Sequence, residues 1–163
     1  MAARKHIDPI ARFMQDHDKV LVVLASLNKA TRSIADHGYT DDAFRRLSSA
    51  MAYLDGEVGV HNMSEEKALF PVLERYVEGP TRLMRADHKV LKKEFRRLRR
   101  AAEHVEKNRS NKRAALELAA VSKGLVQLFV NHIHKENHIL FPLVQKFLTR
   151  DALREIARRM IDA

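Results

Sequence analysis

The sequence predicts an all-α protein, and three observations lead to that fold class. Only 5 of the 163 residues are glycine and 4 are proline, which is too few for a turn-rich β-sandwich. Hydrophobic residues make up 45% of the chain and charged residues 31%, a balance typical of a globular domain. Apolar residues recur at alternating spacings of three and four along four long segments. We therefore expect one domain over residues 1–163, built as an antiparallel up-down-up-down four-helix bundle with a short C-terminal helix.

The first two helices are bounded by recognisable signals. The first is expected to begin at Pro9, because Asp8 is a good N-cap and proline suits the first helical position. It is expected to end at Gly38, since glycine commonly follows the last turn of a helix. The second begins at about Thr40 and continues to about Val72.

The second half of the chain repeats this arrangement. The third helix follows Gly79-Pro80, and the fourth begins near Ser110 or Asn111 and completes a bundle over about residues 8–148. A shorter amphipathic segment after Asp151 predicts a terminal helix over about residues 151–162. The connections are short, and short connections join antiparallel neighbours.

Six ionisable residues stand in the apolar stripes where aliphatic residues are expected, and every helix of the bundle contributes at least one. Burying such groups is costly unless they are paired or bound to a metal ion. A shift of 71 residues places His17 on His88, and it also superposes the other members of the set in pairs. The repeat predicts approximate two-fold symmetry with a site near its axis. The six residues are His17, His61, Glu65, His88, His132 and Glu136.

The residue types in this set predict a site for two transition-metal ions. The chain has no cysteine, so a thiolate site is excluded and the ligands are nitrogen and oxygen atoms. Each ion could take two histidines, with both glutamates bridging, and such a set suits iron, manganese or zinc. With one oxo or hydroxo bridge each ion would hold about five ligands, which leaves a position open for dioxygen, peroxide, nitric oxide or water.

Two strings carry a resemblance to a known family. The segment His61-Asn-Met-Ser-Glu65-Glu66-Lys-Ala-Leu-Phe-Pro71 and the segment His132-Ile-His-Lys-Glu136-Asn-His-Ile-Leu-Phe-Pro142 each follow a histidine on the preceding helix. This doubled pattern resembles the hemerythrin-like, or HHE cation-binding, domains of the bacterial type with four histidines and two glutamates. The resemblance implies an oxo- or hydroxo-bridged pair of iron ions, in preference to manganese or zinc, held by the six residues named above.

The chain departs from two branches of that family. Oxygen-carrying hemerythrins have a further histidine on the third helix, whereas Met84 and Lys92 flank His88 here, and their last carboxylate stands where this chain has Asn137. Relatives that repair iron–sulfur clusters carry an additional N-terminal segment with cysteine, which this sequence lacks. The motifs therefore do not favour oxygen carriage or repair of iron–sulfur clusters as the function.

Three acidic residues are candidates for a role beside the ligands. Asp16 and Asp87 precede a predicted ligand in each half, so each could hold a neighbouring imidazole, cap a helix turn or face solvent. Glu66 adjoins Glu65 but is rotated about 100° from it, which favours a supporting or surface position. Apolar residues within one or two turns of a ligand are expected to form a dry pocket. These pocket candidates are Phe13, Leu24, Met84, Phe95, Leu125 and Phe129.

The remaining features leave alternatives open. The formal charge of +9 and the basic run 92–100 could serve a polyanion, but the run is better explained as a solvated helix exterior, and we do not expect a nucleic-acid partner. His134 and His138 are best explained as surface residues, with an incidental metal site as the alternative.

We expect a cytoplasmic protein without a membrane segment. Its function would be binding or processing of a small diatomic molecule or peroxide, such as peroxide decomposition. The alternatives are a non-catalytic oxygen or iron sensor and a basic nucleic-acid binder with structural histidines.

Overall fold

Four long helices and several shorter ones make up the protein, which is described over residues 8–162 by a computed structural model. Residues 1–7 and 163 lie outside the described part. Within residues 8–162 the secondary structure is entirely helical, so the all-α prediction is confirmed. The elements are α1 (Pro9–His37), α2 (Asp41–Ser64), η1 (Glu65–Leu69), α3 (Phe70–Leu73), α4 (Pro80–Lys107), α5 (Lys112–Lys135), η2 (Glu136–Leu140), α6 (Phe141–Phe147) and α7 (Arg150–Asp162).

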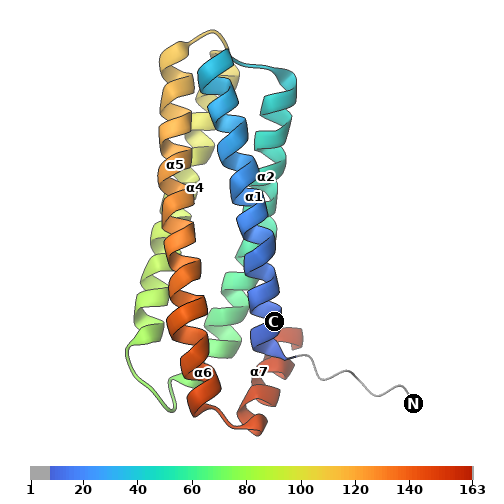
Figure 1. The fold of residues 1–163 in the computed structure, drawn as a ribbon, viewed down its shortest axis with the longest axis vertical. Coiled ribbons are helices and arrows are strands. Elements are labelled where there is room, and N and C mark those ends of the chain that lie inside the picture. Colours follow the sequence, from blue (N-terminus) through green and yellow to red (C-terminus); the bar gives the residue numbers. More distant parts are fainter. Residues whose placement is uncertain (1–7, 163) are drawn as a thin grey trace, which may run out of the picture.

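The long helices lie side by side along one axis of the molecule (Figure 1). The chain turns back at the upper end of the view between α1 and α2 and again between α4 and α5, and it crosses from α3 to α4 at the lower end. Successive long helices therefore run in opposite directions. The largest interfaces join α1 to α2, α4 to α5 and α1 to α5, and α7 packs beneath the bundle.

Local capping explains where the helices begin. The Asp8 carboxylate accepts a hydrogen bond from the backbone N–H of Ile10 at 3.0 Å, and the Thr40 and Asn111 side chains accept bonds from N–H groups in the first turns of α2 and α5. Asn111, rather than Ser110, is thus the N-cap of α5. Gly38 ends α1 with a φ of 86°, a value that L side chains rarely adopt.

Two short π-helical turns, η1 and η2, interrupt the helices at equivalent places in the two halves. The N–H of Phe70 bonds to the carbonyl of Glu65, and the N–H of Phe141 bonds to the carbonyl of Glu136. A proline follows each turn, and in a regular α-helix its ring would clash with the carbonyl four residues earlier. The wider turn relieves that clash. Apolar spacing predicted continuous α-helix through both turns, and the structure corrects this detail.

Two hydrophobic clusters fill the interior. One occupies the part of the bundle toward Gly38 and includes Leu27, Leu47, Leu98 and Leu118, all fully buried. The other occupies the opposite end, where α3, α6 and α7 meet the first turns of α1. The predicted terminal helix is present as α7, whose Ile156 is completely buried in this second cluster.

We predict that Ile156→Ala destabilises the protein by about 2 to 5 kcal/mol, because it removes a fully buried side chain and leaves a cavity between α7 and the bundle. Chemical denaturation followed by circular dichroism measures the change. Arg154→Ala is the matched control on the same helix, since Arg154 is exposed and pairs only with the exposed Asp151 at 3.6 Å. Equal stability of the two variants would show that α7 does not contribute to the core.

Candidate metal centre

The six predicted ligands come together between the two hydrophobic clusters. Each of α1, α2, α4 and α5 contributes one histidine, and η1 and η2 contribute the two glutamates. All six side chains are between 0 and 6% exposed. The fold thus joins distant parts of the chain. Nε2 of His17 lies 3.1 Å from Oε1 of Glu136, a residue 119 positions later.

The six residues form two overlapping groups of four. One contains His17 and His61, the other contains His88 and His132, and both contain Glu65 and Glu136. Within each group the potential ligand atoms lie within 4.8 Å of one another. The two carboxylates therefore stand between two pairs of imidazoles, which is the arrangement that bridging ligands require.

The inner distances show how the glutamates are shared. Oε1 of Glu65 lies 2.7 Å from Nε2 of His61, whereas Oε2 of the same carboxylate lies 3.1 Å from Nε2 of His88. Oε1 of Glu136 lies 3.1 Å from the Nε2 atoms of both His17 and His132. All four histidines thus direct Nε2 toward the centre.

The outer nitrogen of every histidine is held by an acceptor from another helix. Nδ1 of His61 donates to Asp16, and Nδ1 of His132 donates to Asp87, at 2.9 and 3.0 Å. Nδ1 of His88 donates to Glu66 at 2.8 Å, and Nδ1 of His17 donates to Oδ1 of Asn137 at 2.7 Å. Because Nδ1 carries the proton, a neutral imidazole presents the lone pair of Nε2 to the centre.

Sequence reasoning missed Asn137 as one of these acceptors. Asn137 is equivalent to Glu66 in the 71-residue repeat, and this equivalence could have indicated that both residues contact a histidine. In a regular helix the residue after a ligand is turned away from it, but the π-helical turns begin at Glu65 and Glu136 and change the direction of the next side chain.

The atoms at the centre fit a metal ion. Nε2 of His88 and His132 and all four oxygens of Glu65 and Glu136 are buried and have no hydrogen-bond partner among the described residues. The 3.1 Å approaches between them do not have hydrogen-bond geometry. Buried polar atoms without partners are costly, and cations placed among nitrogen and carboxylate ligands would satisfy them.

Comparison with known proteins agrees with this arrangement. The chain matches the hemerythrin HHE cation binding domain over residues 8–144, and a second, overlapping match covers residues 79–162. The protein belongs to the hemerythrin HHE family. It is also 23% identical over 137 residues to the iron-sulfur cluster repair protein YtfE of Yersinia pseudotuberculosis serotype IB (strain PB1/+). That alignment covers 82% of this chain and 61% of the relative, so the HHE chain spans less than two thirds of the relative's length.

The stretch Lys112–Phe147 of the HHE domain is long and apolar enough to cross a membrane by length and composition alone. It nevertheless packs against α1 and α4 and supplies His132 and Glu136 to the centre. The stretch is therefore a helix of the bundle, with one face packed against α1 and α4.

The electrostatics of the HHE centre favour bound protons when no metal is present. Burial lowers the pKa of His61, but the charge of Glu65 and the hydrogen bond to Asp16 outweigh it and raise the pKa to about 10. Burial likewise opposes ionisation of Glu65, yet the charge and close contact of His61 hold the pKa of that carboxyl well below its usual range. Metal binding must therefore displace protons from the imidazoles.

A small cavity of about 80 Å³ between α1 and α2 reaches His61 from outside. Of the six predicted pocket residues only Phe13 lines it, with its ring edge-on to His61 at 5.2 Å between centroids. The other five predicted pocket residues do not line this cavity, and proximity along a helix does not indicate which side of the site is open. Leu24, Phe95, Leu125 and Phe129 belong to the cluster toward Gly38, and Met84 belongs to the opposite one. Residues that line the cavity and were not predicted include Tyr53, Val60 and Met160.

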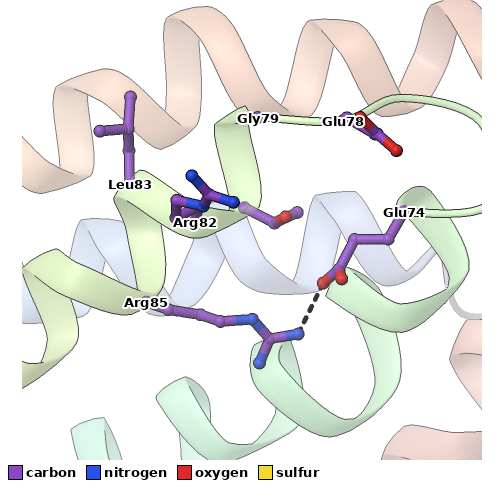
Figure 2. Close-up of a pocket in the computed structure, with 7 residues that line it drawn as sticks. Glu74, Glu78, Gly79, Arg82, Leu83 and Arg85 are labelled. Carbon is purple, nitrogen blue, oxygen red and sulfur yellow. Dashed lines mark hydrogen bonds and ion pairs between the residues drawn. The ribbon is translucent and has the colours of Figure 1, made fainter.

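A larger cavity of about 790 Å³ lies at the start of α4, and none of the six predicted ligands lines it. Figure 2 shows Arg85 reaching across it to Glu74, and the two side chains form an ion pair with a 2.6 Å contact. The cavity is also lined by Glu78, Gly79, Arg82 and Leu83, which Figure 2 labels. This cavity is thus a surface feature separate from the centre.

Two further sequence features also lie outside the centre. His134 and His138 are exposed, and their ring centroids are 4.3 Å apart. In the basic run, Arg97 pairs with Glu94 and Arg99 pairs with Asp55 on α2. Neither feature contacts the six predicted ligands through any described ion pair or hydrogen bond.

We predict that the metal-free protein loses stability as the pH rises from about 6.5 to 10. The folded-state pKa of His61 is raised to about 10 from an ordinary value of 6.5. Its stabilising contribution is therefore complete below pH 6.5 and is lost as the pH rises through about 10. Thermal unfolding of chelator-treated protein at pH 6, 8 and 10 measures this dependence.

The control for this prediction is His61→Gln, which removes one titrating group and should make the dependence less steep, since burial of His88 and His132 is likewise outweighed by contacts with Glu65 and Glu136, which raise the pKa values of both histidines. A wild-type protein with constant thermal stability from pH 6 to 10 would contradict the prediction, because the raised pKa requires a loss of stability on deprotonation.

Proposed function

We propose that this protein is a non-haem di-iron protein that binds or processes dioxygen, peroxide or nitric oxide. The observation that carries the proposal is the pair of overlapping groups around Glu65 and Glu136. Within these groups, all four carboxylate oxygens and Nε2 of His88 and His132 lack hydrogen-bond partners among the described residues. Membership of a cation-binding family supports it. Iron is favoured over manganese and zinc by the resemblance of the motifs, and a cytoplasmic location is part of the proposal.

In this proposal each residue has a defined task. His17 and His61 would hold one ion, His88 and His132 would hold the other, and Glu65 and Glu136 would be shared between the two. Two iron ions held in this way would supply electron transfer to a small molecule and open positions at which it could bind. The outer hydrogen bonds keep all four Nε2 atoms directed inward, so the ligand set is organised before metal arrives.

Aromatic rings exclude water from the centre. Phe141 stacks on His17 with 5.5 Å between ring centroids, and Phe70, its equivalent in the repeat, stacks on His88 at 5.9 Å. Both phenylalanines are at most 1% exposed. A dry environment strengthens the electrostatic interactions of the ligands and restricts side reactions.

A separate general base is not part of this proposal. The described carboxylates that touch the ligands, Asp16, Glu66 and Asp87, each accept a hydrogen bond from an imidazole. Their role is to orient the ligands, so any catalysis would be redox chemistry centred on the metal ions.

We predict that purified protein contains about two iron ions per chain and that both ions are lost in variants that remove a bridging carboxylate. Glu65→Gln and Glu136→Gln keep the side-chain volume while removing the charge. Metal analysis, together with the visible spectrum under air and under reductant, measures the outcome. Glu117→Gln, an exposed position on α5, is the control and should retain both ions.

Two results would overturn the di-iron proposal. One is a fully folded wild-type protein that takes up no metal after reconstitution with ferrous iron. The other is an unchanged iron content in both glutamine variants, which would exclude bridging by Glu65 and Glu136. Circular dichroism of each variant establishes that loss of iron is not loss of fold.

A second candidate function is repair of iron–sulfur clusters, which the similarity to YtfE favours. It stands second because it rests on a relative that is 23% identical to this chain. A non-catalytic sensor uses the same centre without turnover. A purely structural role of the histidines is not favoured, because Nε2 of His88 and His132 and the oxygens of Glu65 and Glu136 have no hydrogen-bond partner among the described residues.

We predict that the iron-loaded protein consumes peroxide over many turnovers and does not restore a damaged cluster. The two assays are oxygen evolution after addition of peroxide and recovery of a [4Fe–4S] hydro-lyase inactivated by nitric oxide. Recovery that requires Glu65 would establish repair instead. Stable binding of nitric oxide without turnover in either assay would indicate a sensor.

A further inference from the structure

The outer hydrogen bonds of the centre follow the internal repeat, but one pair of equivalent residues differs in charge. Asp16 on His61 corresponds to Asp87 on His132, and both acceptors are carboxylates. Glu66 on His88 corresponds to Asn137 on His17, where a carboxylate is replaced by a neutral amide. The difference is chemical rather than geometric, since the two hydrogen bonds are 2.8 and 2.7 Å long.

The two aspartates do not distinguish the halves, because each has cations nearby. Lys135 contacts Asp87 at 2.5 Å between Nζ and Oδ2. Arg12 and Lys19 line the cavity next to Asp16, and their charges act on its carboxylate. Lys135 thus pairs directly with Asp87, whereas Arg12 and Lys19 act on Asp16 from further away. Both imidazoles nevertheless keep a carboxylate acceptor, so the type of acceptor differs between the halves at Glu66 and Asn137.

An anionic acceptor on Nδ1 makes the opposite nitrogen of an imidazole a stronger metal ligand than a neutral acceptor does. Glu66 therefore makes Nε2 of His88 a stronger metal ligand. Asn137 offers His17 only a neutral acceptor, so Nε2 of His17 gains less. Both Nε2 atoms face the same shared glutamates, so the remaining ligand set is equal for the two ions.

We propose that the exchange of a carboxylate for an amide between Glu66 and Asn137 makes the two metal subsites unequal, with the subsite of His88 and His132 binding its ion about 10- to 100-fold more tightly. This inference rests on the proposed function, since it assumes that the six ligands bind metal. The weaker subsite, that of His17 and His61, is also the one reached by the cavity between α1 and α2. Exchange of its ion and entry of a small ligand therefore occur on the same side of the molecule.

The test isolates each subsite so that cooperation between the ions does not obscure the comparison. His17→Ala leaves the subsite of His88 and His132, and His88→Ala leaves the subsite of His17 and His61. Titration of each metal-free variant with Co²⁺, followed by its visible absorption against a competing chelator, measures the affinity for one ion. We expect His17→Ala to bind Co²⁺ about 10- to 100-fold more tightly than His88→Ala.

Isosteric changes at the two acceptors then assign the cause. Adding Glu66→Gln to His17→Ala should weaken Co²⁺ binding about 10- to 100-fold, and adding Asn137→Asp to His88→Ala should strengthen it by a similar factor. The reverse combinations are matched controls, because each acceptor then lacks its imidazole. Glu66→Gln in His88→Ala and Asn137→Asp in His17→Ala should change the affinity by a much smaller factor, because only the through-space effect of the charge remains.

Equal affinities of the two single variants would overturn the inference, as would an equal effect of Glu66→Gln in both backgrounds. Circular dichroism confirms that each variant is folded. If the wild-type protein and both single variants fail to bind Co²⁺ and ferrous iron, the proposed function itself fails, and that result is distinct from binding with equal affinities.

Discussion

The burial of two carboxylates and four imidazoles at the middle of a helical bundle is the constraint on which the rest of the structure depends. Glu65 and Glu136 are completely buried, and neither has a hydrogen-bond partner among the described residues. Charges in such a place require counter-charges close by, from protons on the imidazoles or from metal ions. The arrangement of the helices, the outer acceptors and the flanking aromatic rings all serve to keep these six groups at one level of the bundle.

Much of this arrangement followed from the sequence, because the governing signals are periodic. Apolar spacing predicted the long helices, and local capping chemistry placed their starts at Asp8, Thr40 and near Asn111. The six candidate ligands stood out because histidine and glutamate occupied apolar positions in both halves at the same offset. The repeat also predicts where the site lies, because two equivalent hairpins that share one site must be arranged about a common axis.

The features that the sequence did not predict depend on the directions of side chains and the relative placement of helices, which the position of a residue in the chain does not determine. A helical wheel places Glu66 and Asn137 away from the centre, yet the π-helical turns bring both onto imidazoles. Pro71 and Pro142 were visible in the repeat, but whether proline kinks, ends or widens a helix depends on the surrounding packing. The cavity beside His61 is similarly formed by α1, α2 and Met160 of the terminal helix, three segments whose relative placement is tertiary.

Sharing of the glutamates has a consequence for how the two halves of the chain stay together. Each group of four ligands takes three residues from one hairpin and a single glutamate from the other. A bound ion would therefore act as a cross-link between segments that are far apart in the chain, in the way that a disulfide closes a long loop in a secreted domain. In a chain without cysteine, a metal ion at the centre would add such a link to the packing of α1 against α5, so resistance to unfolding would rise with the supply of metal.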